Sequence, residues 1–104
     1  CINQTINTIY EKLPLARVCI VTPTPWKRNG HNDDAMGEYV NKIQDICALR
    51  GIPCLNLFDT SGLRPNDDTF RKLVYVEDVG CHLNEIGHKL MAPKFKAMLD
   101  TLIL

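Results

Sequence analysis

Hydrophobic positions at the start of the chain recur with the spacing of a helix. They fall on Ile2, Ile6, Ile9 and Leu13, three or four residues apart, as one face of an α-helix requires. Pro14 ends the pattern, because proline has no backbone N–H to donate. No capping residue precedes this helix. We therefore expect the chain to begin inside or just before a helix, as part of a longer polypeptide.

A strand, a helix and a second strand follow in that order. Residues 16–21 and 52–58 are short, nearly continuous apolar runs, which are typical of strands buried on both faces. Between them, residues 33–50 place their apolar side chains on one helical face. Gly51 then suits the left-handed conformation that ends many helices. The pattern therefore predicts a βαβ unit.

This βαβ unit indicates where ligands and chemistry would gather. Its right-handed crossover makes the two strands parallel, so that their carboxyl ends open on the same edge of the sheet. In open α/β sheets that edge is where ligands bind. Residues 23–30 and 59–81 would lie there.

Two further elements are expected before the end of the chain. Residues 72–76 form a short edge strand or an ordered loop, and residues 84–102 form a helix with Asn84 as its N-cap. Pro93 would kink this helix or interrupt its first turn. We expect an α/β fold with three α/β/α layers around a parallel sheet. Because two or three parallel strands cannot stand alone, further strands would precede residues 1–104.

Composition and charge narrow the classes of function. The 104 residues are 45% hydrophobic and 23% charged, which is typical of one small globular domain. Twelve basic and twelve acidic residues cancel without forming long blocks, which argues against nucleic acid or an anionic membrane as partner. No apolar run is long enough to span a bilayer, and the first residues of the sequence lack the basic start and apolar core of a signal peptide. We expect a soluble protein.

The cysteines indicate a reducing environment. There are five of them, an odd number without a Cys-x-x-Cys pair, so neither a disulfide framework nor a thiolate metal site is predicted. Cys19 and Cys54 lie within apolar runs, where free thiols behave as small buried hydrophobes. A reducing, cytoplasmic compartment is favoured.

The segment before the last helix contains the groups of a proton-transfer site. Glu77 and Asp78 are followed by Gly80 and then by His82. A carboxylate that accepts the Nδ1 proton of a histidine fixes its tautomer, and leaves Nε2 to take a proton from a nucleophile. The glycine turn would let residues so near in sequence face each other.

Residues 82–88, His-Leu-Asn-Glu-Ile-Gly-His, carry a family resemblance. Preceded by an acid and a glycine, they resemble the last sequence block of the SGNH (GDSL-type) hydrolases, in which Asp, two residues and His precede Pro or Leu, Asn and Gly-His. Residues 18–23 and 55–59 resemble the last two core strands of that family. The resemblance implies a flavodoxin-like fold of which this chain is the C-terminal portion. It also implies a serine-type acyl-ester hydrolase that needs no cofactor.

The resemblance implies that His82 is the general base and that Asp78 orients it. The family places its Asp three residues before the His, where this chain has Val79, so Glu77 is an alternative acid. The family's Gly-Asp-Ser nucleophile block, its oxyanion-hole glycine and its Gly-x-Asn-Asp block are absent from these residues. The nucleophile would come from the N-terminal part of the same domain, and the 104 residues alone would be inactive.

Three other residues have side chains that could take part in a functional site. Ser61 is the only serine, and its setting indicates a turn serine that bonds nearby backbone rather than a nucleophile. Trp26 is expected to line the substrate cleft, or to anchor its loop. His88 is expected to pack or to hydrogen-bond. A zinc site is not predicted, because His82 and His88 are not spaced as a pair on one helical face.

Three hypotheses on function follow. The first is hydrolysis of a short-chain acyl ester, such as an O-acetyl ester, of a small molecule, a lipid or a carbohydrate. The second is a non-catalytic binding or structural module that retains the fold, which the displaced acid favours. The third is a flavodoxin-like ligand-binding domain, although no glycine-rich phosphate loop follows either strand.

Overall fold

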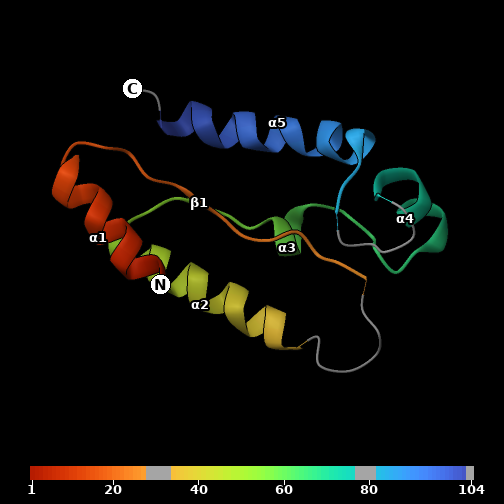
Figure 1. Ribbon diagram of the computed structural model, residues 1–104, viewed down its shortest axis with the longest axis horizontal. Helices are drawn as coiled ribbons and strands as arrows, with labels where there is room; N and C mark the ends of the chain where they lie inside the picture. Colours follow the sequence, from red (N-terminus) through yellow and green to blue (C-terminus); the bar gives the residue numbers. More distant parts are fainter. Residues whose placement is uncertain (28–33, 77–81, 103–104) are drawn as a thin grey trace.

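The computed structural model describes residues 1–27, 34–76 and 82–102. Figure 1 shows α5 on one side of the two strands, with α1 and α2 on the other side. The elements follow the order α1 (Ile2–Lys12), β1 (Ile20–Val21), α2 (Asp34–Arg50), β2 (Cys54–Leu55), α3 (Leu57–Thr60), α4 (Asp68–Val74) and α5 (Glu85–Leu102).

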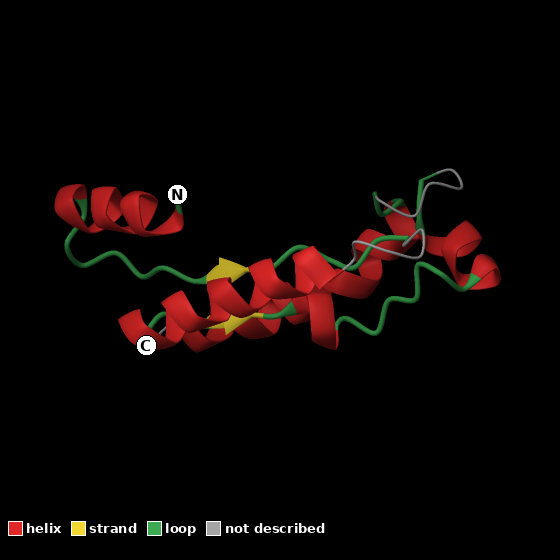
Figure 2. Cartoon of the chain, turned by 90° about the horizontal axis from the view of Figure 1, so that it is seen from below, coloured by secondary structure: helices red, strands yellow, loops and turns green. Residues whose placement is uncertain are grey.

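The prediction of a three-layer α/β/α fold of the flavodoxin or SGNH-hydrolase type is wrong. Within the described residues, the sheet contains only β1 and β2, and most residues are helical. The strands pair in parallel through Ile20 with Cys54 and Val21 with Leu55. The chain is therefore a small, mostly helical domain around a two-stranded parallel ladder (Figure 2).

The second strand is shorter than residues 52–58, because its end becomes a helix. Asn56 caps α3 with its side chain, whose Oδ1 accepts a hydrogen bond from the Asp59 N–H at 3.0 Å. An Asn side chain that accepts from a backbone N–H three residues later favours a helical turn over an extended strand. Leu57 and Phe58 are consequently helical, although their apolar character fitted a strand equally well.

The expected edge strand or loop at residues 72–76 lies largely in α4. Asp67 caps this helix by accepting from the Phe70 N–H at 3.1 Å. The guanidinium of Arg71 is buried, and it donates to Asp68 and to the carbonyl of Pro65. Local polar contacts thus stabilise helical backbone here in place of a ladder with another strand.

The longer helices and the direction of the strands are confirmed. The crossover from β1 through α2 to β2 is parallel, and Gly51 follows α2 with a φ of 66°. Asn84 caps α5, because its Oδ1 accepts from the Gly87 N–H at 3.0 Å. The predicted interruption is not seen, since α5 continues through Pro93 as one helix.

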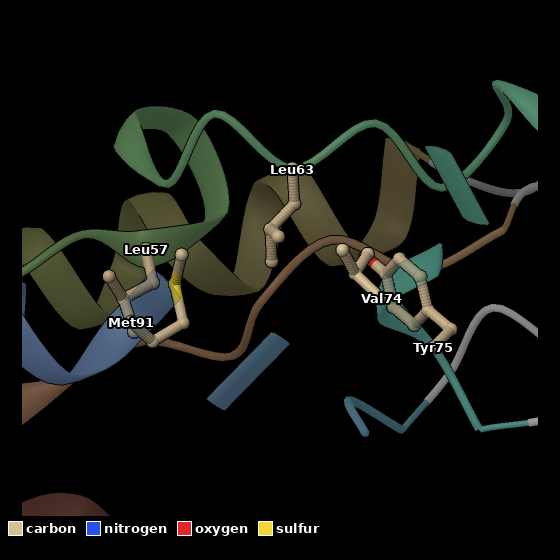
Figure 3. Packing of buried hydrophobic residues seen from close by; sticks show 5 residues of the cluster. All are labelled: Leu57, Leu63, Val74, Tyr75 and Met91. Carbon is tan, nitrogen blue, oxygen red and sulfur yellow. The ribbon is translucent and has the colours of Figure 1, made fainter. Parts of the chain in front are cut away.

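Hydrophobic side chains form two clusters. Because successive residues of a strand point to opposite faces, β1 and β2 contribute to both. Val21 and Leu55 pack against the first cluster, and Ile20 and Cys54 pack against the second. The buried members of the first cluster are Leu57, Leu63, Val74, Tyr75 and Met91 (Figure 3). Those of the second are Ile6, Cys47 and Ile52.

The thiol of Cys54 is expected to be slow to alkylate. Burial, the neighbouring Cys47 and a hydrogen bond to Cys47 raise the pKa of Cys54 from 9.0 to about 11. Because the thiolate is the reactive form, this rise lowers the reactive fraction about a hundredfold near pH 8. We expect iodoacetamide to modify the exposed Cys1 far sooner than Cys54, as peptide mass spectrometry over time would show. Equal alkylation rates for Cys1 and Cys54 would contradict the raised pKa of Cys54.

Candidate functional site

His82 lies in a short segment that leads from α4 to α5. Its carbonyl accepts a hydrogen bond from the Val76 N–H at 2.7 Å, and next to it Tyr75 and Leu83 form an isolated antiparallel bridge. The Asn84 N–H then donates to the last carbonyl of α4 at 2.8 Å. These backbone contacts hold the histidine's main chain in place, while its side chain is exposed.

The first turn of α5 is clamped against the end of α4. The side-chain amide of Asn84 donates to the Leu73 carbonyl at 2.9 Å, in addition to capping α5. A Cβ atom at Gly87 would lie 2.5 Å from the Val74 carbonyl oxygen and 2.9 Å from side-chain atoms of Leu83. Only glycine permits this approach, so Gly87 determines how closely α5, the helix that follows His82, packs on α4.

The His82 side chain lines a pocket of about 280 Å³. Thr24 from the loop after β1 and Leu57 from the segment after β2 line the same pocket, which places it at the carboxyl ends of the parallel strands. The βαβ pattern of the sequence predicts ligand binding at this edge. The complete lining consists of Thr24, Leu57, His82, Leu83, His88, Met91 and Phe95.

Thr22 joins the ends of the two strands at this pocket. Its side chain is 3% exposed, and its Oγ1 accepts from the Phe58 N–H at 3.1 Å. The same hydroxyl lies 3.4 Å from the Oδ1 of Asn56, to which it can donate. The loop after β1 is thereby tied to the start of α3. This positioning role of Thr22 could not be predicted from the sequence, since nothing local indicates a partner more than thirty residues away.

Tyr75 fixes the same loop from the other side. Its buried hydroxyl donates to the Pro25 carbonyl at 2.9 Å, and its ring belongs to the cluster in Figure 3. Since Pro25 directly follows Thr24, this bond sets the wall of the pocket that Thr24 contributes. The sequence predicts only an edge strand or an ordered loop around Tyr75, and it does not indicate this hydrogen bond.

The other predicted site residues stand as follows. Asp78 and its alternative Glu77 lie outside the described residues, so the acid that would orient His82 stays a prediction. Trp26 is half-buried two residues after Thr24, and its place in the cleft also stays a prediction. His88, expected to pack or hydrogen-bond, is exposed and shares the pocket with His82.

Ser61 has the turn role that its sequence setting predicts. The residue is 8% exposed, and its Oγ accepts a hydrogen bond from the Leu63 N–H at 3.2 Å. A serine that bonds backbone two residues ahead stabilises a turn. Its hydroxyl is therefore engaged in local structure.

Comparison with known proteins shows a likeness of fold alone. No protein-family model and no curated protein matches the chain. A crystal structure of a Lactobacillus plantarum protein, a structural genomics target, superposes with a TM-score of 0.79 at 18% identity, covering 95% of this chain and 51% of that one. A second crystal structure has a TM-score of 0.79 at 22% identity, covering 96% and 50%. The chain thus spans about half the length of both proteins.

Across residues 1–27, 34–76 and 82–102, no helix combines the length and the apolar character that crossing a bilayer requires.

Proposed function

We propose that this chain carries the histidine part of a serine-type acyl-ester hydrolase, with His82 as the general base. The observation that supports the proposal is the exposed imidazole of His82 in a pocket at the carboxyl ends of two parallel strands. Histidine is the side chain that most often transfers protons in catalysis. The SGNH-like motif at residues 82–88 supports the same assignment.

In the proposed reaction, His82 moves one proton in each of two steps, acylation and deacylation. A serine from a segment outside these 104 residues attacks the ester carbonyl, and Nε2 of His82 takes the serine proton. The protonated imidazole then gives that proton to the departing alcohol as the carbon–oxygen bond breaks and the acyl-enzyme forms. Water, activated by the same imidazole, releases the acid and restores the serine. Asp78, or Glu77 in its place, would accept a hydrogen bond from the Nδ1–H group and so hold the ring.

The rest of the pocket fits a short acyl ester. Leu57, Met91 and Phe95 provide apolar surface beside the imidazole, and among the residues that the structure describes no carboxylate or ammonium group lines the pocket. An uncharged acyl group can occupy such a site without leaving a buried charge unpaired. We propose short-chain, O-acetyl-type esters of a small molecule, a lipid or a carbohydrate as the substrate class.

The test is ester turnover together with labelling of the nucleophile. We expect the full-length protein that contains these residues to hydrolyse p-nitrophenyl acetate, whereas the 104 residues alone do not. A fluorophosphonate reagent should label one serine outside residues 1–104, identified by peptide mass spectrometry. Labelling of Ser61, or turnover by the 104 residues alone, would show that the nucleophile is misassigned. Absence of turnover in the full-length protein would favour the non-catalytic module instead.

A further inference from the structure

The outer edge of β1 is open for pairing. The N–H groups of Ile20 and Thr22 donate to the carbonyls of Pro53 and Leu55, each at 3.0 Å. Because backbone groups alternate in direction along a strand, the N–H and C=O groups of Cys19 and Val21 point to the opposite edge. The described part of the chain places no strand on that edge. An unpaired edge of this kind is a template for another strand.

An apolar groove runs beside this open edge. Its volume is about 490 Å³, and it lies between α1 and the segment that leads into β1, which Figure 2 shows in extended form. Within the part of the chain that the structure describes, no charged side chain lines it. The side chains that matter here are Ile2, Ile6 and Ile9 from α1, with Val18, Cys19 and Ile20 from the strand side. An apolar groove next to an open strand edge fits a polypeptide segment with apolar side chains.

The molecule as a whole also exposes more surface than a self-contained domain. Its accessible area is 7191 Å², whereas a folded chain of this size exposes about 5,900 Å². Its radius of gyration is 15.5 Å, compared with about 13 Å for a compact domain of this length. The excess area of about 1,300 Å² exceeds the roughly 800 Å² that each partner buries in a standard interface.

We infer that the β1 edge and the α1–β1 groove together form the interface for a second polypeptide segment, which adds a strand to β1 and fills the groove with apolar side chains. The occupant is a different sequence of about this chain's length, not a second copy. The two similar crystal structures support this choice, because each contains about as many residues again beyond the matched half. The inference goes beyond the proposed function, since the interface is needed whether or not the pocket catalyses hydrolysis.

Hydrogen–deuterium exchange tests the strand pairing without reference to activity. The comparison uses the protein isolated from the cells that make it and the 104 residues expressed alone. We expect the amides of Cys19 and Val21 to exchange at least about a hundredfold more slowly in the isolated protein, while the Ile20 and Thr22 amides are protected in both. Equal exchange at Cys19 and Val21 in the two samples would overturn the interface.

Two matched substitutions and a cross-link test the groove and its occupant. Ile9→Lys places a charge in the groove and should remove the added protection, whereas Leu15→Lys, at a site that is 95% exposed and outside the groove, should not. With Ile9→p-benzoylphenylalanine, photo-cross-linking should join the groove to an apolar, strand-forming segment outside residues 1–104. A cross-link to a second copy of this chain, or none, would overturn the assignment of the occupant.

Discussion

In the full-length protein, His82→Ala is expected to lower kcat for p-nitrophenyl acetate by about 10²–10⁴-fold, which is the range that a positioned general base contributes. The loss should appear in kcat more than in KM, because proton transfer contributes to the transition state and adds little to substrate binding. The side chain of His82 is exposed, and the contacts that the described residues make with its segment involve backbone atoms, so its removal should leave the fold intact. Steady-state kinetics with a circular dichroism control would measure both effects.

His88→Ala is the matched control for this experiment. His88 lines the same pocket, and it presents the same kind of side chain from the first turn of α5. If it only borders the substrate, its removal should change KM by a few fold and leave kcat nearly unchanged. A larger loss of kcat in His88→Ala than in His82→Ala would mean that the wrong imidazole has been assigned as the base.

Features with a local cause were predictable from the sequence. The end of α2 at Gly51 depends on a single residue that tolerates positive φ, and the start of α5 depends on an Asn side chain that reaches three residues ahead. The parallel direction of β1 and β2 follows from the handed crossover between them. His82 lines a pocket at the carboxyl ends of these strands, while its catalytic role stays a prediction.

The fold class could not be predicted, because apolar content does not distinguish a short strand from a short helix. Residues 52–58 have the composition of a buried strand, yet the side chain of Asn56 turns their second half into α3. The three-layer fold expected from the sequence requires more parallel strands, and the described residues contain only β1 and β2. The resemblance to SGNH hydrolases lies mainly in the motif around His82. It did not predict the architecture of this chain.

The pocket's remaining walls depend on contacts between distant residues. Tyr75 bonds the carbonyl of Pro25, fifty residues earlier, and Thr22 bonds the start of α3. Neither position has an unusual sequence setting, since a tyrosine in an apolar run and a threonine after a strand are both common. Such positioning roles become visible only once the chain has folded.

Gly87→Ala is expected to destabilise the fold, because it adds a methyl group where the structure leaves no room for one. The new Cβ would lie 2.5 Å from the Val74 carbonyl oxygen, a backbone atom that moves only if α4 and α5 separate. Overpacking of this kind costs about 1–3 kcal/mol, and occasionally more. Urea unfolding should show a lower midpoint with little change in slope. Since the glycine supports the segment that presents His82, turnover by the full-length protein should fall as well.

The same substitution at Gly37 separates this steric cost from the ordinary effect of alanine in a helix. Gly37 lies within α2, and a Cβ there meets nothing within 4 Å. Replacing glycine by alanine in an open helical position raises stability by about 0.5–1 kcal/mol, because alanine loses less backbone entropy on folding. The two variants should therefore shift the urea midpoint in opposite directions. If Gly87→Ala were neutral or stabilising like Gly37→Ala, α5 would not approach α4 as closely as the structure shows, and the support proposed for His82 would be lost.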